Sequence, residues 1–215
     1  MNTKKVVIWG ASGHAKVVAD IIRLNHQYNI IGFLDSQSPE RKGESFYGST
    51  ILGGVDEIEI LLEKKITNII MGFGDCLARD LLFHKLIKKG FYFINAIHPK
   101  STIAADAVIG QGVVVCAGVV INSNTVIGDN VIVNTSSSID HDCTIDESSH
   151  ISPGVHLAGG VTVGKGTWIG IGSIVKEKIT IGNNVIIGAG SLVLNDIPSK
   201  VLTYGSPAKI IKWIK

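Results

Sequence analysis

Aliphatic residues recur every six positions through the second half of the chain. Stepping by six from Ile97 to Val193 meets Ile, Val or Leu at every position. This period matches neither the 3.6-residue repeat of an amphipathic helix nor the two-residue alternation of a strand. It is typical of a parallel β-helix built from hexapeptide repeats, in which three hexads form one triangular coil. The pattern therefore predicts about five to six coils, with residues 18 apart stacked and the aliphatic side chains pointing inwards.

Apolar runs alternate with helical spacing in the first 95 residues, which predicts a small parallel α/β sheet. The expected strands are Lys5–Trp9, Ile30–Leu34, Asn68–Phe73 and Phe91–Ala96, and the expected helices are Ala15–Arg23, Val55–Lys65 and Arg79–Lys89. The polar segment Ser36–Ser49 is expected to be a mobile loop, and Pro99 marks the passage into the β-helix. We expect a Rossmann-like domain over residues 1–95, and an all-β parallel β-helix with a C-terminal tail over residues 96–215.

Composition narrows the function classes. The net charge of +2 gives no reason to expect nucleic-acid binding. The longest run of apolar residues and glycine, Val113–Ile121, is far shorter than the roughly 18 residues that a membrane-spanning helix needs. The first residues do not resemble a signal peptide. Three scattered cysteines without a CxxC motif, Cys76, Cys116 and Cys143, are typical of reduced thiols in a cytoplasmic protein.

The turn Gly10-Ala-Ser12-Gly13-His14 follows the first expected strand and opens a helix. In such sheets ligands bind outside the carboxyl ends of the strands, and backbone N–H groups at a helix start hold phosphate. Asp35 ends the second strand, where an acid accepts hydrogen bonds from a ribose or a base. The glycine pattern is shorter than GxGxxG, so it favours a mononucleotide or nucleotide sugar over a dinucleotide. A plain structural turn is the alternative interpretation.

The triplet Asp140-His141-Asp142 interrupts the repeat. His141 is the third residue of its hexad, where side chains point outwards, and adding 18 gives Gly159. We therefore expect the imidazole to lie roughly 5 Å from Gly159, one coil along. An imidazole beside a glycine N–H suggests a general base beside an oxyanion donor, as acyl transfer to an amine or hydroxyl requires. A carboxylate would fix the tautomer, and both Asp140 and Asp142 qualify. A solvated corner histidine is the alternative.

His150 and His156 raise the hypothesis of a zinc site, because hexapeptide β-helices also include enzymes resembling γ-class carbonic anhydrases, which bind metal through three histidines. Here the three histidines lie 9 and 6 residues apart, so none stacks on another. His150 and His156 are expected on successive corners of the triangle. We therefore predict that the protein binds no metal.

The chain resembles the sugar O-acyltransferase group, which includes sialic acid O-acetyltransferases of the NeuD family and PglD-like nucleotide-aminosugar N-acetyltransferases. The resemblance covers essentially the whole chain and rests on Gly10–His14, Gly32–Asp35, Asn134–Cys143, Ser149–His150, Ala158–Gly159 and Gly205–Lys209. It implies a left-handed β-helix and a homotrimer with active sites between adjacent subunits. A closed threefold also suits the flat sides of a triangular prism.

The resemblance also implies residue roles. His141 would be the general base and Asp142 its partner, although many relatives have Glu there. The nucleotide sugar would be bound by Gly10, Ser12, Gly13, His14, Asp35 and Asn134. Acetyl-CoA, the co-substrate, would be bound by His150, Gly159, Ile171, Gly172, Gly205, Pro207, Ala208 and Lys209.

These observations predict an acetyl-CoA-dependent N-acetyltransferase acting on a 4-amino-4,6-dideoxy sugar linked to UDP, GDP or dTDP. The first alternative is an O-acetyltransferase of a sialic-type sugar, in which the same base would activate a hydroxyl. The second is a non-catalytic scaffold that binds a nucleotide sugar.

Overall fold

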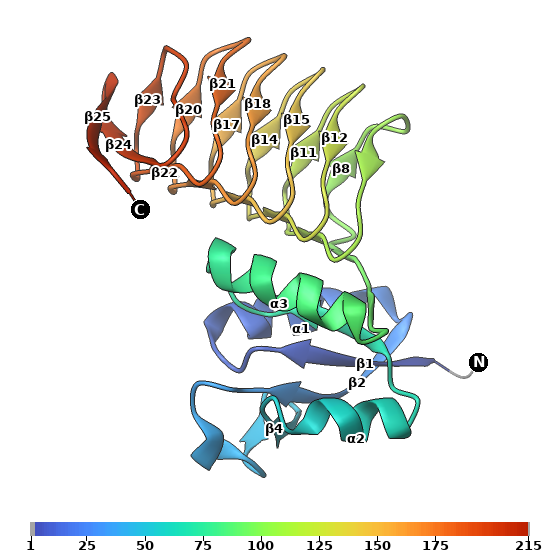
Figure 1. Cartoon of the computed structure of the whole chain (residues 1–215). Helices are drawn as coiled ribbons and strands as arrows, with labels where there is room; N and C mark the ends of the chain where they lie inside the picture. Colours follow the sequence, from blue (N-terminus) through green and yellow to red (C-terminus); the bar gives the residue numbers. More distant parts are fainter. Residues whose placement is uncertain (1–2, 215) are drawn as a thin grey trace.

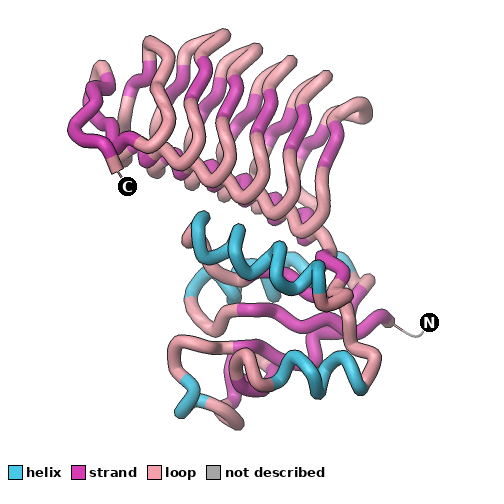
Figure 2. The backbone as a smooth tube through the Cα atoms, viewed as in Figure 1, coloured by secondary structure: helices cyan, strands magenta, loops and turns pink. Residues whose placement is uncertain are grey.

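The computed structural model describes residues 3–214. A small α/β part at the N-terminus lies against a prism of stacked coils that runs to the C-terminus (Figure 1). Figure 2 shows that the helices belong to the first part, whereas the prism consists of short strands joined by turns. Within the described residues, no helix has both the length and the apolar character needed to cross a membrane.

The N-terminal sheet has six strands in the order β3-β4-β2-β1-β5-β6. Its strands are β1 (Lys4–Trp9), β2 (Tyr28–Leu34), β3 (Ser45–Phe46), β4 (Ser49–Gly53), β5 (Asn68–Met71) and β6 (Tyr92–Phe93). The helices are α1 (Gly13–Asn25), α2 (Glu57–Glu63) and α3 (Cys76–Lys88), with a 3-10 turn η1 (Pro39–Arg41). The central strand β1 pairs in parallel with β2 and β5. This is the Rossmann-like sheet that the alternating pattern predicts.

Helices cover both faces of this sheet. Val18 and Ile22 of α1 pack with one face, and this core continues into the interior of the prism. Ile58 of α2 and Phe83 of α3 pack with the other face. The first turn of α3 also contacts the prism, because the guanidinium of its Arg79 donates hydrogen bonds to carbonyl groups there. Helices α1 and α3 therefore both join the sheet to the prism (Figure 1).

Three expectations for the N-terminal part need correction. The predicted mobile loop 36–49 contains η1 and β3. Strand β3 pairs with β4, and its Phe46 packs edge-on against Phe33. The run 91–96 is not one strand: β6 extends the N-terminal sheet, whereas β7 (Ala96–Ile97) pairs with the prism. Helix α3 begins at Cys76 rather than Arg79, because the Asp75 carboxylate caps it by accepting from the Ala78 N–H at 2.7 Å.

The prism is a left-handed parallel β-helix, as the six-residue period and the family resemblance predict. Each hexad supplies one two-residue strand, and successive strands pass to successive sides. Side 1 contains β7 (Ala96–Ile97), β10 (Val114–Val115), β13 (Ile132–Val133), β16 (His150–Ile151), β19 (Trp168–Ile169) and β22 (Ile186–Ile187). Side 2 contains β8 (Thr102–Ile103), β11 (Val120–Ile121), β14 (Ser138–Ile139), β17 (His156–Leu157), β20 (Ile174–Val175) and β23 (Leu192–Val193). Side 3 contains β9 (Val108–Ile109), β12 (Val126–Ile127), β15 (Thr144–Ile145), β18 (Thr162–Val163) and β21 (Thr180–Ile181).

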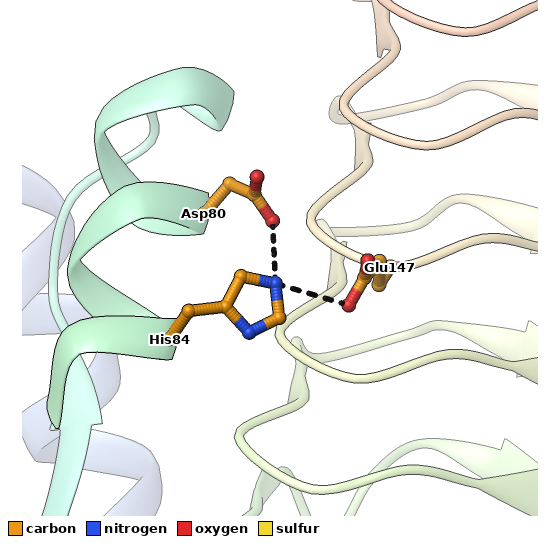
Figure 3. A group of neighbouring side chains, drawn as sticks. All are labelled: Asp80, His84 and Glu147. Carbon is orange, nitrogen blue, oxygen red and sulfur yellow. Dashed lines mark ion pairs between the residues drawn. The ribbon is translucent and has the colours of Figure 1, made fainter. Parts of the chain in front are cut away.

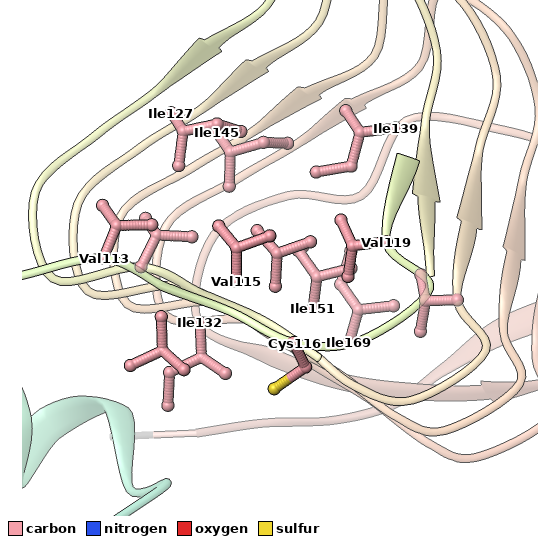
Figure 4. Packing of buried hydrophobic residues seen from close by; sticks show 14 of the residues in the cluster. Val113, Val115, Cys116, Val119, Ile127, Ile132, Ile139, Ile145, Ile151 and Ile169 are labelled. Atoms are coloured by element: carbon pink, nitrogen blue, oxygen red, sulfur yellow. The ribbon is translucent and has the colours of Figure 1, made fainter. Parts of the chain in front are cut away.

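The second residue of each of these strands is the recurring aliphatic residue, and it points inwards. Pairing connects residues 18 apart, such as Val115 with Val133 and Ile151 with Ile169. From the second coil onwards these side chains are buried and stack in columns (Figure 4). The ladder holds every coil in one register, so outward residues on neighbouring coils are aligned as strictly as the core.

A hairpin of β24 (Val201–Gly205) and β25 (Ala208–Trp213) ends the chain. Strand β24 continues side 1 in parallel with β22, and β25 then pairs antiparallel with β24. The C-terminal tail is therefore a closing element of the β-helix.

Candidate active site

The first half of the glycine turn and Asp35 line one cavity at the carboxyl ends of β1 and β2, whereas Gly13 is not among its lining residues. Its volume is about 470 Å³, and Gly10, Ser12 and Asp35 are among its lining residues. Gly10 has φ of +129°, and an added Cβ would lie 2.8 Å from the Gly72 carbonyl oxygen. Only glycine therefore permits this turn.

The start of α1 opens beside the same cavity. Gly13 is its first residue, and the N-cap Ser12 makes no side-chain capping bond. The first turn contains no acidic residue, so no side-chain carboxylate offsets the positive end of the helix dipole. These features suit an anion such as a diphosphate.

Arg41 is a residue of this cavity that the sequence analysis missed. Its guanidinium forms an ion pair with Asp35 Oδ2 at 3.1 Å and donates to the Ala11 carbonyl oxygen at 3.0 Å. The other carboxylate oxygen of Asp35 accepts from the N–H groups of Gln37 and Ser38. Asp35 thus organises the loop beside the cavity through both of its carboxylate oxygens. The only sequence signal for Arg41 is its place in a polar stretch, where Lys42 follows it directly and hides it.

His14 lies elsewhere than predicted. It is not among the residues that line the cavity, because its ring points towards the β-helix, with its centroid 6.4 Å from that of His150. There His150 Nδ1 contacts the Gly74 carbonyl oxygen at 3.3 Å and Nε2 contacts the Asn134 amide nitrogen at 3.2 Å. The carbonyl can only accept and the amide can only donate, so Nδ1 carries the proton and Nε2 accepts. His14, Asn134 and His150 therefore form one cluster between the α/β part and side 1.

Burial holds both imidazoles of this cluster neutral. Desolvation, reinforced by the nearby Arg79 charge, lowers the pKa of His150 to about 3 and that of His14 to about 4. The His14 Nε2 atom is buried and has no hydrogen-bond partner among residues 3–214. The His150 ring also stacks parallel on Trp168, with centroids 5.8 Å apart.

His141 and Gly159 lie at the edge between side 2 and side 3, stacked as predicted. The Gly160 N–H donates to the His141 carbonyl oxygen at 2.9 Å, which aligns the two coils. A Cβ on Gly159 would lie 2.7 Å from both Cε1 and Nε2 of the His141 ring. The ring is 61% exposed. An accessible imidazole therefore lies directly beside a backbone without a side chain.

The structure distinguishes between the two candidate carboxylates. Asp142 Oδ2 lies 2.7 Å from His141 Nδ1, whereas Asp140 Oδ1 accepts the backbone N–H of His141. Asp142 occupies a turn position with a left-handed backbone, with φ of +60°. Its other oxygen accepts from the Asn124 amide at 2.6 Å. The short side chain of Asp142 thus reaches the His141 ring, as expected.

These contacts set the protonation of the pair. The hydrogen bond to Asp142 raises the pKa of His141 above its ordinary value, and the Asp140 charge adds to this. The hydrogen bond from Asn124, followed by that from His141, lowers the pKa of Asp142. With Nδ1–H donated to Asp142, the neutral ring presents the Nε2 lone pair outwards.

The three histidines of the zinc hypothesis do not meet. His150 and His156 occupy the first positions of β16 and β17, so they lie on successive sides of the prism rather than on its corners. His150 is buried beneath the α/β part, whereas His156 is exposed and contacts Ser138 Oγ at 2.7 Å. The group with metal-like spacing among the described residues is instead Asp80, His84 and Glu147 (Figure 3).

That group joins α3 to the edge between side 3 and side 1. His84 Nε2 lies 3.4 Å from Asp80 and 3.6 Å from Glu147. Lys165 already forms ion pairs with both carboxylates, at 3.1 Å and 2.6 Å. We therefore interpret it as an ion-pair network between the two parts of the chain.

The remaining residues predicted to bind coenzyme A lie in two places. Ile171 and Gly172 are at the edge between side 1 and side 2, the edge that also carries Asn134. Gly205, Pro207, Ala208 and Lys209 form the tip of the terminal hairpin. A larger cavity of about 980 Å³ at the first coil contains none of the predicted site residues.

Comparisons with known proteins agree with this arrangement. Residues 5–86 match the PglD N-terminal domain family, and residues 160–195 match the bacterial transferase hexapeptide family. PerB from Caulobacter crescentus, solved with CoA and GDP-perosamine, is 37% identical over 97% of both chains, with a TM-score of 0.92. The chain belongs to the PglD-like acetyltransferase family.

Two further structures extend the comparison. The acetyltransferase domain of PglB from Neisseria gonorrhoeae, solved with acetyl coenzyme A, is 35% identical over 98% of this chain and 100% of that one, with a TM-score of 0.90. WeeI from Acinetobacter baumannii, at 24% identity and a TM-score of 0.84, shares the fold. A search of curated proteins found no match. The PglD-like chain is thus an acetyltransferase whose co-substrate is acetyl-CoA.

Proposed function

We propose that this acetyltransferase transfers the acetyl group of acetyl-CoA to the 4-amino group of a nucleotide-linked 4-amino-4,6-dideoxy sugar. The observation that carries the proposal is the exposed His141 ring, bonded to Asp142 at 2.7 Å and stacked beside Gly159. Its support in relatives is the perosamine N-acetyltransferase from Caulobacter crescentus, 36% identical, of which a histidine-to-asparagine variant was solved with CoA and GDP-perosamine.

The chemistry follows from the free Nε2 of His141. The sugar nitrogen attacks the thioester carbonyl carbon while Nε2 takes a proton from the nitrogen. Asp142 stabilises the imidazolium that forms, and the Gly159 N–H donates to the oxygen that becomes negative. The C–S bond then breaks, and the imidazolium returns its proton to the coenzyme A thiolate.

We propose that the two parts of the chain divide the task, with residues 1–95 binding the nucleotide sugar and residues 96–215 carrying the transfer. Gly10, Ser12 and Gly13 would hold the diphosphate at the start of α1, and Asp35 would face the base. His14, Asn134 and His150 would contact the sugar or the acetyl group. Ile171, Gly172 and the hairpin tip, Gly205 to Lys209, would lie along coenzyme A.

Active sites between subunits of a homotrimer suit this geometry. His141 lies at one edge of side 2 and Asn134 at the other, so the whole width of side 2 separates them within one chain. A neighbouring copy that presents its own Asn134 edge to His141 would complete the site, and threefold closure repeats the contact. We place the enzyme in the cytoplasm, where its three buried free thiols, Cys76, Cys116 and Cys143, would stay reduced.

The test is turnover of acetyl-CoA with a panel of UDP-, GDP- and dTDP-linked 4-amino-4,6-dideoxy sugars and with free sialic acids. Thiol release and the mass of the product are measured. We expect acetylation of at least one amino sugar and a loss of about 10²–10⁴ in rate for His141→Ala. Reaction with sialic acid alone would favour the O-acetyltransferase. A rate that does not change in His141→Ala would favour the non-catalytic scaffold.

Shared sites are tested by mixing two inactive variants, His141→Ala and His150→Ala. If each site takes His141 from one chain and His150 from its neighbour, random assembly restores about a quarter of the sites, since each residue is intact with a chance of one half. Absence of any recovery in co-expressed variants, together with a monomeric sedimentation coefficient, would refute the arrangement.

A further inference from the structure

Arg79 is a buried cation without an acidic partner. It lies in the first turns of α3, has 0% of its surface exposed, and forms no ion pair with any carboxylate of residues 3–214. A buried charge is costly unless hydrogen bonds satisfy it. The contacts that do so therefore indicate what the residue holds in place.

Apart from a 3.8 Å contact of Nη2 with Cys76 Sγ on its own helix, those contacts lie on the β-helix. Arg79 Nη2 donates to the carbonyl oxygens of Ser148 at 2.8 Å and Ser149 at 3.2 Å. Nη1 donates to the carbonyl oxygen of Asn130 and lies 3.3 Å from its side-chain oxygen. Asn130 and Ser148 are 18 residues apart, so one planar guanidinium fastens two successive coils to α3.

The same segment holds the ring of His150. Ser149, which Arg79 binds, directly precedes His150, and the Gly74 carbonyl oxygen at the entrance to α3 lies 3.3 Å from His150 Nδ1. The ring is thus fixed from two directions, through its own backbone and through Nδ1. Its Nε2 atom then accepts from the Asn134 amide at 3.2 Å.

The charge of Arg79 acts on this ring as well. After burial, it is the largest cause of the lowered pKa of His150, ahead of His14 on α1. Cys76 of α3 is buried alongside, and burial raises the pKa of its thiol, which favours the neutral form. Trp168 covers one face of the imidazole. Arg79 is thus the positive charge that most disfavours protonation of His150.

We propose that Arg79 is a positioning residue for acetyl transfer: by docking α3 across two coils it fixes the orientation and tautomer of His150, and with them the Asn134 amide. The inference rests on the proposed function, because His150 and Asn134 are the groups through which it reaches the substrate. The contact between the two parts of the chain would therefore contribute to catalysis, as well as holding the parts together.

A double-variant cycle separates positioning from simple stabilisation. Arg79→Met and His150→Asn are made singly and together, and kcat and KM are measured for each. We expect a loss in kcat/KM on the order of 10- to 100-fold for each single variant. If Arg79 acts through His150, the kcat/KM of the double variant is no lower than that of the less active single variant. Losses that multiply would overturn the proposal.

Lys165→Met is the matched control. It removes ion pairs to Asp80 and Glu147 at the same contact. Lys165 itself contacts neither Ser148 nor Ser149, and the hydrogen bond from Ser148 Oγ to Asp80 stays available. We expect activity within about twofold of wild type, because surface ion pairs contribute little. An equal loss of kcat/KM in Lys165→Met would show that mere loosening of α3 explains the effect. Arg79→Lys, which keeps the charge but cannot bridge two coils bidentately, serves if Arg79→Met does not fold, with the same expectation of non-additivity.

A second readout does not depend on turnover. Trp168 stacks on His150, so protonation of the imidazole changes the fluorescence of the indole. The Trp168→Phe variant shows which part of the total fluorescence comes from Trp168. We expect the midpoint of the fluorescence change to move to higher pH in Arg79→Met, because a repelling charge is gone. Far-UV circular dichroism at each pH separates this change from acid unfolding. An unmoved midpoint would refute the coupling. A moved midpoint in a protein that acetylates no amino sugar would refute the proposed function instead.

Discussion

Gly159→Ala tests the catalytic edge with a single methyl group. The backbone of Gly159 is outside the left-handed region, so alanine fits the chain without strain. Its Cβ would lie 2.7 Å from Nε2 and Cε1 of His141, whereas ordinary contacts begin at 3.4 Å. The ring must therefore move by about 0.7 Å or swing aside, which disturbs its 2.7 Å contact with Asp142. A misplacement near 1 Å costs about 10²-fold in rate, so we expect kcat/KM to fall by 10- to 100-fold.

The assay compares wild type, Gly159→Ala, His141→Ala and the double variant, with the melting temperature of each. Because the His141 ring is 61% exposed and can move into solvent, we expect stability to change by no more than about 0.5 kcal/mol. In the His141→Ala background the added methyl group meets no ring and should cost nothing further. Full activity in Gly159→Ala, or an additional loss in the double variant, would refute the reasoning.

Three further predictions concern charge and pH. Asp142→Asn should move the acid limb of the pH profile of kcat/KM to lower pH and lower its plateau. The reason is that the hydrogen bond from His141 to Asp142 raises the pKa of His141, which must be neutral to act as a base. An acid limb that does not move would contradict this. The free energy of unfolding should fall as pH decreases below 6.5, because the unfolded chain protonates His14 and His150 before the folded chain does. With folded pKa values of about 4 and about 3, each histidine lowers the free energy of unfolding by about 2 kcal/mol at pH 5. Urea midpoints at pH 7 and pH 5 measure this, and His150→Asn should show a smaller difference between them. Arg41→Met should weaken nucleotide-sugar binding roughly tenfold in calorimetry by freeing the loop, with acetyl-CoA binding unchanged; equal weakening of both would point to a general fold defect.

The β-helix could be predicted almost completely from the sequence. A hexad has one inward position, and the ladder leaves no freedom in register, so a period of six fixes both the core and the neighbours on adjacent coils. That is why stacking 18 residues apart correctly put Gly159 beside His141. The residues alone left Asp140 and Asp142 open as the partner carboxylate, and the family resemblance favoured Asp142. Whether its short side chain reaches the ring required the structure, which shows a 2.7 Å contact.

The contact between the two parts of the chain was not predictable in the same way. Arg79 lies in an ordinary helix, so nothing local distinguishes it from a solvated cation. His14 was expected beside a phosphate because of its place in the turn, yet its ring faces His150. Such features depend on how α1 and α3 dock against side 1, and no short-range pattern records that docking.

The terminal hairpin has a consequence for colloidal behaviour. Side 1 of the β-helix would otherwise end in the unpaired N–H and C=O groups of β22, a template for end-to-end association into fibres. Reversal of direction at β25 stops the parallel series, and Lys209 and Lys212 put positive charge on the last strand. A chain truncated before Val201 would lose the hairpin of β24 and β25, and its molecules would tend to polymerise along the axis of the coils.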